Sequence, residues 1–297
     1  MRKPPEPNRL LADEFGYAGF HRAKPANSEN LQFSELHCGP DSNETMENLM
    51  NNTPYMKRIL ILSDIHGNLT ALDAVLHAAY EKHIDGVILL GDLIDYGPDS
   101  NEVIERLSDI PQEKILINIW GNHEHAIMNG DFGRFSSKRG EMSAQYTRTR
   151  LTEASLDYLK EMNRTGMAVF HLNGRKCLAV HGSLEDYFWK SIVAGEDSLQ
   201  YKEFDYVFSG HSHIPHDYQY FYESSDKDFR YKKRTVFINP GSVGQPRNHN
   251  PNAHFAIWDT DNESVELLAV QYDIESEVKR FTDDVDVFYK ERIRKGI

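Results

Sequence analysis

A strand–helix–strand pattern between residues 58 and 91 constrains the fold more than any other feature of the sequence. The apolar run RILILS (58–63) predicts a buried strand, NLTALDAVLHAAYEKH (68–83) has apolar residues at helical spacing, and GVILLG (86–91) predicts a second strand. A helix that connects two strands in this way implies parallel strands and a right-handed crossover. The pattern therefore predicts an α/β fold.

The remaining elements continue this alternation around one interruption. Helices are predicted at 100–110 and 143–162, a charged surface helix at 275–293, and strands at 114–120, 166–182 (a hairpin around an Asn-Gly pair), 204–215, 218–224, 234–244, 253–259 and 264–272. We interpret segment 125–163 as a helical insertion over the mouth of the sheet. Residues 1–55 are rich in Pro, Asn and Ser without a period, so we expect a disordered or loosely docked extension before one domain at 56–297.

Charge and composition limit the classes of partner. The net charge of −13 argues against a nucleic-acid groove, because a phosphate backbone requires a basic face. No apolar run reaches the roughly 18–20 residues of a membrane span, no secretory signal pattern opens the chain, and two cysteines are too few for a disulfide framework. We therefore expect a cytoplasmic protein without a membrane partner, and the sequence does not indicate its oligomeric state.

Five polar motifs each follow an apolar run that predicts a strand. They are SDIHGN with Asp64 and His66, GDLID with Asp92 and Asp95, GNHE with Asn122 and His123, VHG with His181, and GHSH with His211 and His213. Taken singly, Asp92 or Asp95 is better explained by a turn or a helix cap, and each histidine by a structural hydrogen bond or a surface position. Together they predict one crevice at the carboxyl ends of the strands.

The chemistry of these side chains indicates metal ions. Carboxylates, imidazoles and an amide without a thiolate suit Mn, Fe, Zn, Ni or Co better than Ca or a structural zinc cluster. The candidates outnumber the ligands of one ion, whereas two divalent ions that share a carboxylate would use them. Manganese is the first candidate, with Fe, Ni, Co, Zn or Mg as alternatives.

The order of the five motifs resembles the signature of the calcineurin-like metallophosphoesterases, and the resemblance covers residues 57–272. SDIHGNLTALDAVL and INPGSVGQPR are similar to its small bacterial phosphodiesterase-like branch. The resemblance implies a four-layer α/β/β/α sandwich of two mixed sheets, with 125–163 as a helical cap insertion. It also implies the metal ligands: Asp64, His66 and His213 for the first ion, Asn122, His181 and His211 for the second, and Asp92 between them.

The resemblance further implies hydrolysis of a phosphodiester or phosphomonoester of a small molecule or nucleotide by a metal-bridging hydroxide. His123 would protonate the leaving group or steady the transition state, and we expect Asp95 to orient its ring, although a plain turn role explains Asp95 nearly as well. Arg247, with Asn122 and His123, is the candidate substrate contact, and NPGSVG (239–244) is either an anion-binding loop or a tight turn.

Two positions depart from the related serine/threonine protein phosphatases. Tyr96 and Trp120 stand where those enzymes have arginines that grip a phosphoryl group, which argues against that activity. The alternatives that stay open are a dinucleoside polyphosphate hydrolase, a protein phosphatase, and a non-catalytic scaffold with the same fold.

Overall fold

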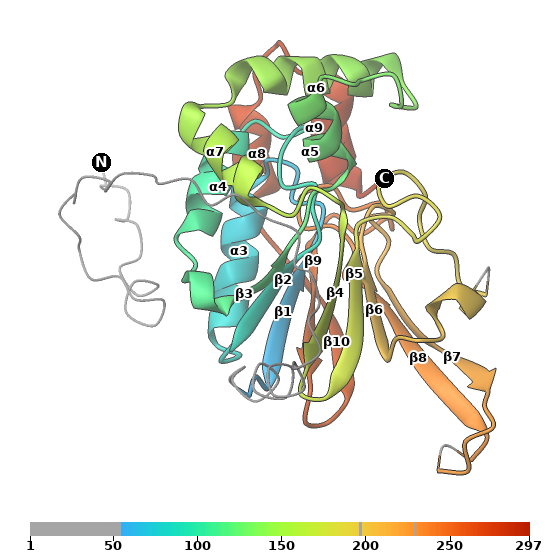
Figure 1. Ribbon diagram of the computed structural model, residues 1–297. Helices are drawn as coiled ribbons and strands as arrows, with labels where there is room; N and C mark the ends of the chain where they lie inside the picture. The colour runs from blue at the N-terminus through green and yellow to red at the C-terminus, as the bar shows by residue number, and fades with distance from the viewer. Residues whose placement is uncertain (1–54, 196–197, 229) are drawn as a thin grey trace, which may run out of the picture. The chain divides into compact units, whose positions relative to one another are not determined.

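Two mixed β-sheets form the centre of the domain (Figure 1). The structure, a computed structural model, describes residues 55–195, 198–228 and 230–297, so the extension predicted at 1–55 lies outside the described residues, except for Tyr55. The first sheet has the order β10-β9-β1-β2-β3, from β1 (Arg58–Leu62), β2 (Gly86–Leu89), β3 (Ile115–Asn118), β9 (Ala253–Asp259) and β10 (Ser264–Val270). The second has the order β4-β5-β6-β8-β7, from β4 (Met167–Leu172), β5 (Arg175–Val180), β6 (Tyr206–Ser209), β7 (His216–Glu223) and β8 (Lys232–Asn239).

The predicted strand–helix–strand unit is present. β1 and β2 pair in parallel, with Ile59 opposite Gly86, and α3 (Leu69–Tyr80) connects them. The side chain of Asn68 accepts a hydrogen bond from the backbone N–H of Ala71 and so caps the first turn of α3. The carboxyl ends of β1 and β2 therefore lie side by side, as the parallel arrangement requires.

The predicted hairpin joins β4 and β5. Asn173 and Gly174 both have positive φ angles, 48° and 78°, as the two central residues of a type I′ turn require. The turn brings β4 antiparallel to β5, whereas β5, β6 and β8 run parallel to one another. Each of the two sheets therefore combines parallel and antiparallel pairs, as predicted.

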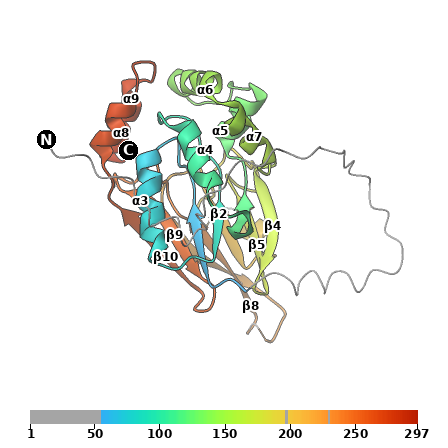
Figure 2. The same cartoon turned by 90° about the vertical axis from the view of Figure 1, so that its left-hand side faces the viewer.

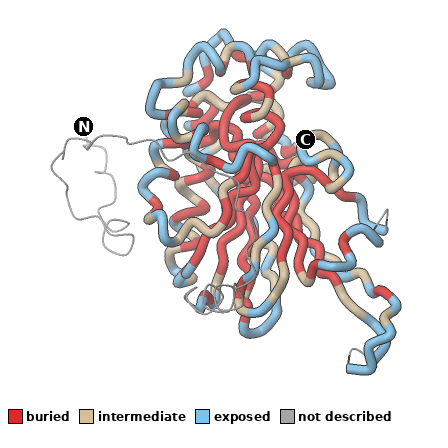
Figure 3. Tube along the Cα trace, in the orientation of Figure 1, coloured by how far each residue is buried: buried red, intermediate tan, exposed pale blue. Residues whose placement is uncertain are grey.

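The layers follow from the burial of the sheet faces. Helices α3 and α4 (Ser100–Ser108) cover the outer face of the first sheet (Figure 2). Side chains including Ile61, Phe208 and Trp258 fill the space between the sheets, and the buried positions follow the strands (Figure 3). On the outer face of the second sheet, the segment that contains the 3₁₀ helix η2 (Ser198–Tyr201) supplies the covering apolar side chains.

Three helices lie in and beside the predicted insertion: α5 (Asn122–Asn129), α6 (Lys138–Arg150) and α7 (Glu153–Glu161). The single helix predicted at 143–162 is divided between α6 and α7, because the chain turns extended at Leu151 and Thr152. Thr152 then accepts a hydrogen bond from the N–H of Ser155 and begins α7. A short 3₁₀ helix, η1 (Gln112–Lys114), precedes β3.

The prediction of one charged surface helix at 275–293 is wrong. The structure has two helices there, α8 (Ile274–Arg280) and α9 (Val287–Lys295). Phe281, Val285, Tyr289 and Ile293 recur every four residues and are buried in one cluster with Tyr96. Both helices are therefore held to the domain by apolar burial. Among the residues that the structure describes, no helix has the length and apolar character that a membrane crossing needs.

Candidate metal centre

The five polar motifs come together at one end of the two sheets. Asp64 and His66 follow β1, Asp92 and Asp95 follow β2, and Asn122 begins α5 after β3. His181 directly follows β5, and His211 and His213 follow β6. Among these eight side chains, all but that of His211 are nearly inaccessible to solvent. The structure therefore assembles every predicted ligand position in one place.

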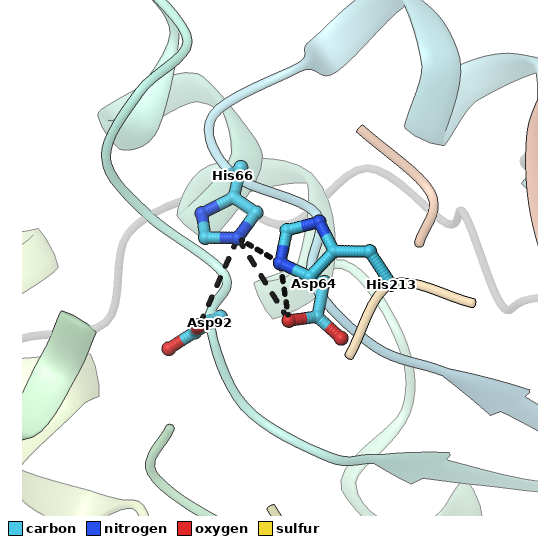
Figure 4. A group of neighbouring side chains, drawn as sticks. All are labelled: Asp64, His66, Asp92 and His213. Carbon is cyan, nitrogen blue, oxygen red and sulfur yellow. Dashed lines mark hydrogen bonds and ion pairs between the residues drawn. The ribbon is translucent and has the colours of Figure 1, made fainter. Parts of the chain in front are cut away.

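One group of four side chains surrounds a single point (Figure 4). The ligand atoms of Asp64, His66, Asp92 and His213 all lie within 4.8 Å of one another. His213 Nε2 is 3.1 Å from Asp64 Oδ1 and 3.2 Å from His66 Nε2, and His66 Nε2 is 3.7 Å from Asp92 Oδ2. Two carboxylates and two imidazoles thus face a common centre.

A second group shares Asp92 with the first. It consists of Asp92, His181 and His211, whose ligand atoms also lie within 4.8 Å of one another. His181 Nε2 is 3.3 Å from Asp92 Oδ2. The amide oxygen of Asn122 lies 3.0 Å from His181 Nε2 and 2.9 Å from His211 Nδ1, so Asn122 belongs to the same group. Asp92 is therefore the side chain common to both groups.

The donor set fits divalent cations. Asp64 Oδ1 is buried 3.1 Å from His213 Nε2, but that nitrogen has no proton to donate when the neutral ring donates from Nδ1 to the Gln245 carbonyl, so the oxygen has no hydrogen bond among the described residues. This arrangement is costly for a carboxylate oxygen unless a cation neutralises it. Nitrogen and oxygen donors without thiolates are also the ligands that first-row divalent metals accept. The residues present can hold two such ions.

Backbone hydrogen bonds orient three of the imidazole rings. The Nδ1 atoms of His181, His213 and His66 lie 2.7, 2.6 and 3.3 Å from the carbonyl oxygens of Leu90, Gln245 and Ile94, respectively. A ring that donates its Nδ1–H outward keeps the Nε2 lone pair for the centre. His211 differs, because its Nδ1 faces the shared amide of Asn122.

The ligand loops are held in a costly backbone conformation. Five of the seven predicted ligands have positive φ angles between 50° and 62°: Asp64, His66, Asp92, His211 and His213. A non-glycine residue in this region costs about 1–3 kcal/mol, and such residues cluster at active sites. The surrounding packing therefore maintains these ligand directions at the expense of stability.

Burial and neighbouring charges shift the pKa values of the centre. Burial lowers the pKa of His211 and of His213 to about 4 and that of His66 well below its usual value. These rings are neutral at pH 7, the form that binds metals. Burial opposes a charge on His181, but Asp92 raises its pKa to about 9, and His181 in turn holds the pKa of Asp92 well below its usual range.

His123 lies beside the centre. Its Nδ1 is 2.7 Å from Asp95 Oδ2, and its Nε2 is 4.0 Å from Asp92 Oδ2. Burial disfavours the charged ring, but Asp92 and the hydrogen-bonded Asp95 raise the pKa of His123 above its usual value. Asp95 therefore makes a hydrogen bond to the ring as well as occupying a turn.

Glu124 stands in the GNHE motif, although no role was predicted for it from the sequence. Its buried carboxylate accepts hydrogen bonds from the backbone N–H groups of Gly121, Asp92, Leu93 and Ile94, at 2.8, 2.8, 2.7 and 3.3 Å. One side chain thus ties the start of α5 to the loop that carries Asp92. Glu124 was visible in the sequence as the last residue of the GNHE motif, but only the fold shows that its carboxylate binds the loop that carries Asp92.

A cleft of about 410 Å³ opens onto the centre. The predicted substrate contacts Asn122, His123 and Arg247 all line it, and so does Tyr96. The Nε atom of Arg247 is buried and has no hydrogen-bond partner among the described residues. Trp120, in contrast, is buried in the core and donates its indole N–H to the carbonyl of Leu159. Four further lining residues were not predicted from the sequence: Arg134, Phe135, Ser136 and Trp189.

The sequence matches proteins of one family. A sequence model described as the calcineurin-like phosphoesterase superfamily domain matches residues 56–263. An uncharacterized protein of Methanocaldococcus jannaschii is 29% identical over 229 residues, which cover 73% of this chain and 88% of that protein. Phosphodiesterase YfcE of Escherichia coli is 24% identical over 221 residues, which cover 72% of this chain and 93% of that protein.

Solved structures share the fold. A metallophosphoesterase from Sphaerobacter thermophilus matches with a TM-score of 0.65 and 26% identity, over 82% of this chain and 100% of that one. A hypothetical protein from Pyrococcus horikoshii matches with a TM-score of 0.64 and 20% identity, over 81% of this chain and 98% of that one. The second likeness concerns the fold alone.

Proposed function

Since the chain belongs to the calcineurin-like phosphoesterase superfamily, and is thus a phosphoric ester hydrolase, we propose that it is a dinuclear-metal phosphodiesterase of small phosphodiesters. The observation that carries this proposal is the position of Asp92, which both candidate ligand groups share. A carboxylate common to two metal groups is typical of two-metal hydrolases. The name of the related protein YfcE, a phosphodiesterase, supports the same reaction class.

In this proposal Asp64, His66 and His213 would hold the first ion, Asn122, His181 and His211 would hold the second, and Asp92 would be a ligand of both. Two divalent ions, with manganese as the first choice, would supply Lewis acidity that activates water and neutralises phosphoryl charge. The buried Asp64 Oδ1, which receives no hydrogen bond among the described residues, would then gain a counter-charge.

The other side chains of the cleft bind the substrate and move a proton. Arg247 donates from its guanidinium to a phosphoryl oxygen, and Asn122 donates from its amide nitrogen, because its amide oxygen faces His181 and His211. His123 donates the Nε2 proton to the leaving alkoxide, and Asp95 accepts the hydrogen bond from Nδ1 and so orients the ring. Charge that develops on the phosphoryl oxygens is thus met by Arg247.

The charge of the cleft favours a diester over a monoester. Arg247 makes no ion pair with a described carboxylate, whereas Arg134, the other arginine of the cleft, pairs with Asp186 at 2.6 Å. Tyr96 and Trp120 occupy the two positions where related phosphatases have arginines. One unpaired guanidinium suits the single charge of a phosphodiester better than the charge of about −1.5 to −2 that a monoester carries at pH 7.

Reconstitution of the metal-stripped protein tests this proposal. We expect added Mn²⁺ to restore hydrolysis of bis-p-nitrophenyl phosphate, with a higher kcat/KM than for p-nitrophenyl phosphate; Co²⁺, Ni²⁺, Zn²⁺ and Mg²⁺ are compared. Asp92→Asn is expected to lower kcat/KM by at least about 10²-fold, whereas the exposed Asp157→Asn is expected to leave it unchanged. Two bound ions per chain without hydrolysis of either ester would refute the proposal.

A further inference from the structure

Two aromatic rings, Phe135 and Trp189, form one wall of the cleft beside the candidate metal centre. Phe135 lies in the connection between α5 and α6, and Trp189 lies in the segment that follows β5. Their ring centroids are 5.2 Å apart and their planes make an angle of 89°. Both side chains are only partly buried, so they present an apolar surface that a bound molecule can contact.

One carboxylate holds the two segments of this aromatic wall together. Asp186 Oδ1 accepts hydrogen bonds from the backbone N–H groups of Phe188 and Trp189, each at 3.1 Å. Asp186 Oδ2 pairs with Arg134 at 2.6 Å, and the Arg134 guanidinium lies over the Trp189 ring at 5.3 Å from its centroid. The wall is therefore positioned before a ligand binds, which reduces the entropic cost of using it.

The aromatic wall lies beside both the proposed proton donor and one candidate ligand. The Phe135 ring lies 5.0 Å from the His123 ring, edge to face, and the Trp189 ring packs against Phe135. Trp189 also lies 6.5 Å from the His211 ring. An ester substituent that leaves toward His123 is therefore within reach of the Phe135 and Trp189 rings.

We infer that this substituent is a nucleoside, so that the substrate is a nucleotide phosphodiester whose base packs against Phe135 and Trp189; the inference rests on the proposed function. A base stacks on an aromatic side chain without sequence preference. A nucleoside carries an aromatic base one sugar away from phosphorus, so the base can contact side chains beside the ligand groups while the phosphoryl group lies at those groups. A cleft of about 410 Å³ lies in the range of small-ligand sites.

Binding of a non-hydrolysable probe tests the inference. The probe is the phosphinate analogue of adenosine 5′-(methyl phosphate), in which carbon replaces both bridging oxygens so that the single charge of a diester is kept, and its reference is the same compound without the base. Calorimetric titration of the full chain loaded with Mn²⁺ should show the probe binding about tenfold or more tightly than its reference. Equal affinity of the two compounds for the wild-type protein overturns the inference.

Two variants test whether the preference for the base arises from the aromatic wall. Trp189→Leu and Phe135→Leu keep an apolar side chain but remove the ring, and each should reduce the preference for the base at least threefold while affinity for the reference changes less than twofold. Tyr187→Ala, two residues before Trp189 and 39% exposed, should keep the full preference. A preference that survives in both leucine variants refutes the wall as the base site. Hydrolysis of bis-p-nitrophenyl phosphate by the same preparations separately tests the proposed function.

Discussion

His123 Nδ1 lies 2.7 Å from Asp95 Oδ2, and this hydrogen bond connects the candidate centre to helix α6. The other oxygen of Asp95 accepts hydrogen bonds from the hydroxyls of Ser143 at 2.6 Å and Thr147 at 2.8 Å, both on α6. Helix α6, which follows Phe135 in the chain, thus also fixes the ring of the proposed proton donor, His123. Asp95 is a positioning residue in this arrangement, because it acts through His123.

Asp95→Asn should lower kcat for diesters with alkyl leaving groups by about 10–10²-fold, because the His123 ring loses its charged partner. The loss should be smaller for bis-p-nitrophenyl phosphate, since p-nitrophenolate leaves with little need of a proton. Steady-state kinetics on both substrates, with metal content measured on the same samples, checks this. Ser143→Ala, which removes one of the hydrogen bonds to Asp95, should show the same selectivity more weakly. An equal loss on both substrates would argue against proton donation.

Gly121→Ala should disrupt the candidate metal centre. A Cβ atom at this position would lie 2.1 Å from Asp92 Oδ1 and 2.5 Å from the Asp92 backbone nitrogen, so the shared carboxylate has to move. We expect fewer than two ions per chain by elemental analysis and a fall in kcat of about 10²-fold. Gly133→Ala is the matched control, because its nearest contact would be at 3.7 Å. Full metal content in Gly121→Ala would contradict the expected displacement.

Helix α9 should support the cleft through Tyr289. Its ring stacks on that of Tyr96 at 4.5 Å, and the Tyr96 ring in turn lies 4.4 Å from that of His123. Tyr289→Ala should therefore lower the free energy of unfolding by about 3–5 kcal/mol and also lower kcat. Denaturant unfolding and steady-state kinetics measure the two effects, and Tyr289→Phe should preserve both quantities. Phe281→Ala, in the same cluster, should lower the free energy of unfolding while kcat stays within twofold. If kcat also falls in Phe281→Ala, the effect of Tyr289→Ala on kcat reflects a general loss of folding and not support of the cleft.

The layout of the candidate centre could be predicted because its residues stand where strands end. Asp64 and Asp92 each follow an apolar strand of one strand–helix–strand unit, and parallel pairing brings such ends together. Glu124 shows the limit of this approach. Its motif was visible, but the four N–H groups that it binds belong to two loops whose contact is tertiary.

The aromatic wall and the C-terminal helices could not be predicted for different reasons. Phe135 and Trp189 lie in connections without periodicity, and the pairing of Asp186 with Arg134 joins these connections only in the folded chain. Between residues 281 and 293 the numerous charges obscured the four-residue spacing of the apolar side chains, which begins after α8, crosses the connection into α9 and is buried beside Tyr96. Composition alone therefore suggested a surface helix, whereas the spacing predicts burial.

Glu277 of α8 provides a test of stability against pH away from the candidate ligands. Its side chain is 0% exposed, Oε2 accepts a 2.6 Å hydrogen bond from the Thr70 hydroxyl, and Oε1 has no partner among the described residues. Burial, with a smaller effect of the Asp99 carboxylate, raises the pKa of Glu277 to about 7, against the hydrogen bond from Thr70 and the charge of Arg280. At pH 6 the folded chain therefore keeps a proton on Glu277 that the unfolded chain has released, because the ordinary pKa of a glutamate is 4.5.

The sign of the effect follows from proton linkage. Between pH 4.5 and 7 the native state binds more protons than the unfolded state, so the contribution of Glu277 to stability falls as pH rises and is lowest above pH 7. Glu277→Gln removes this term, and we expect the free energy of unfolding at pH 8 to rise relative to wild type by about 1–3 kcal/mol, with little change at pH 4.5. Urea unfolding at both pH values measures the difference, and the exposed Glu161→Gln on α7 is the control. A variant that is less stable than wild type at pH 8 would show that the carboxylate is bound favourably in its charged form.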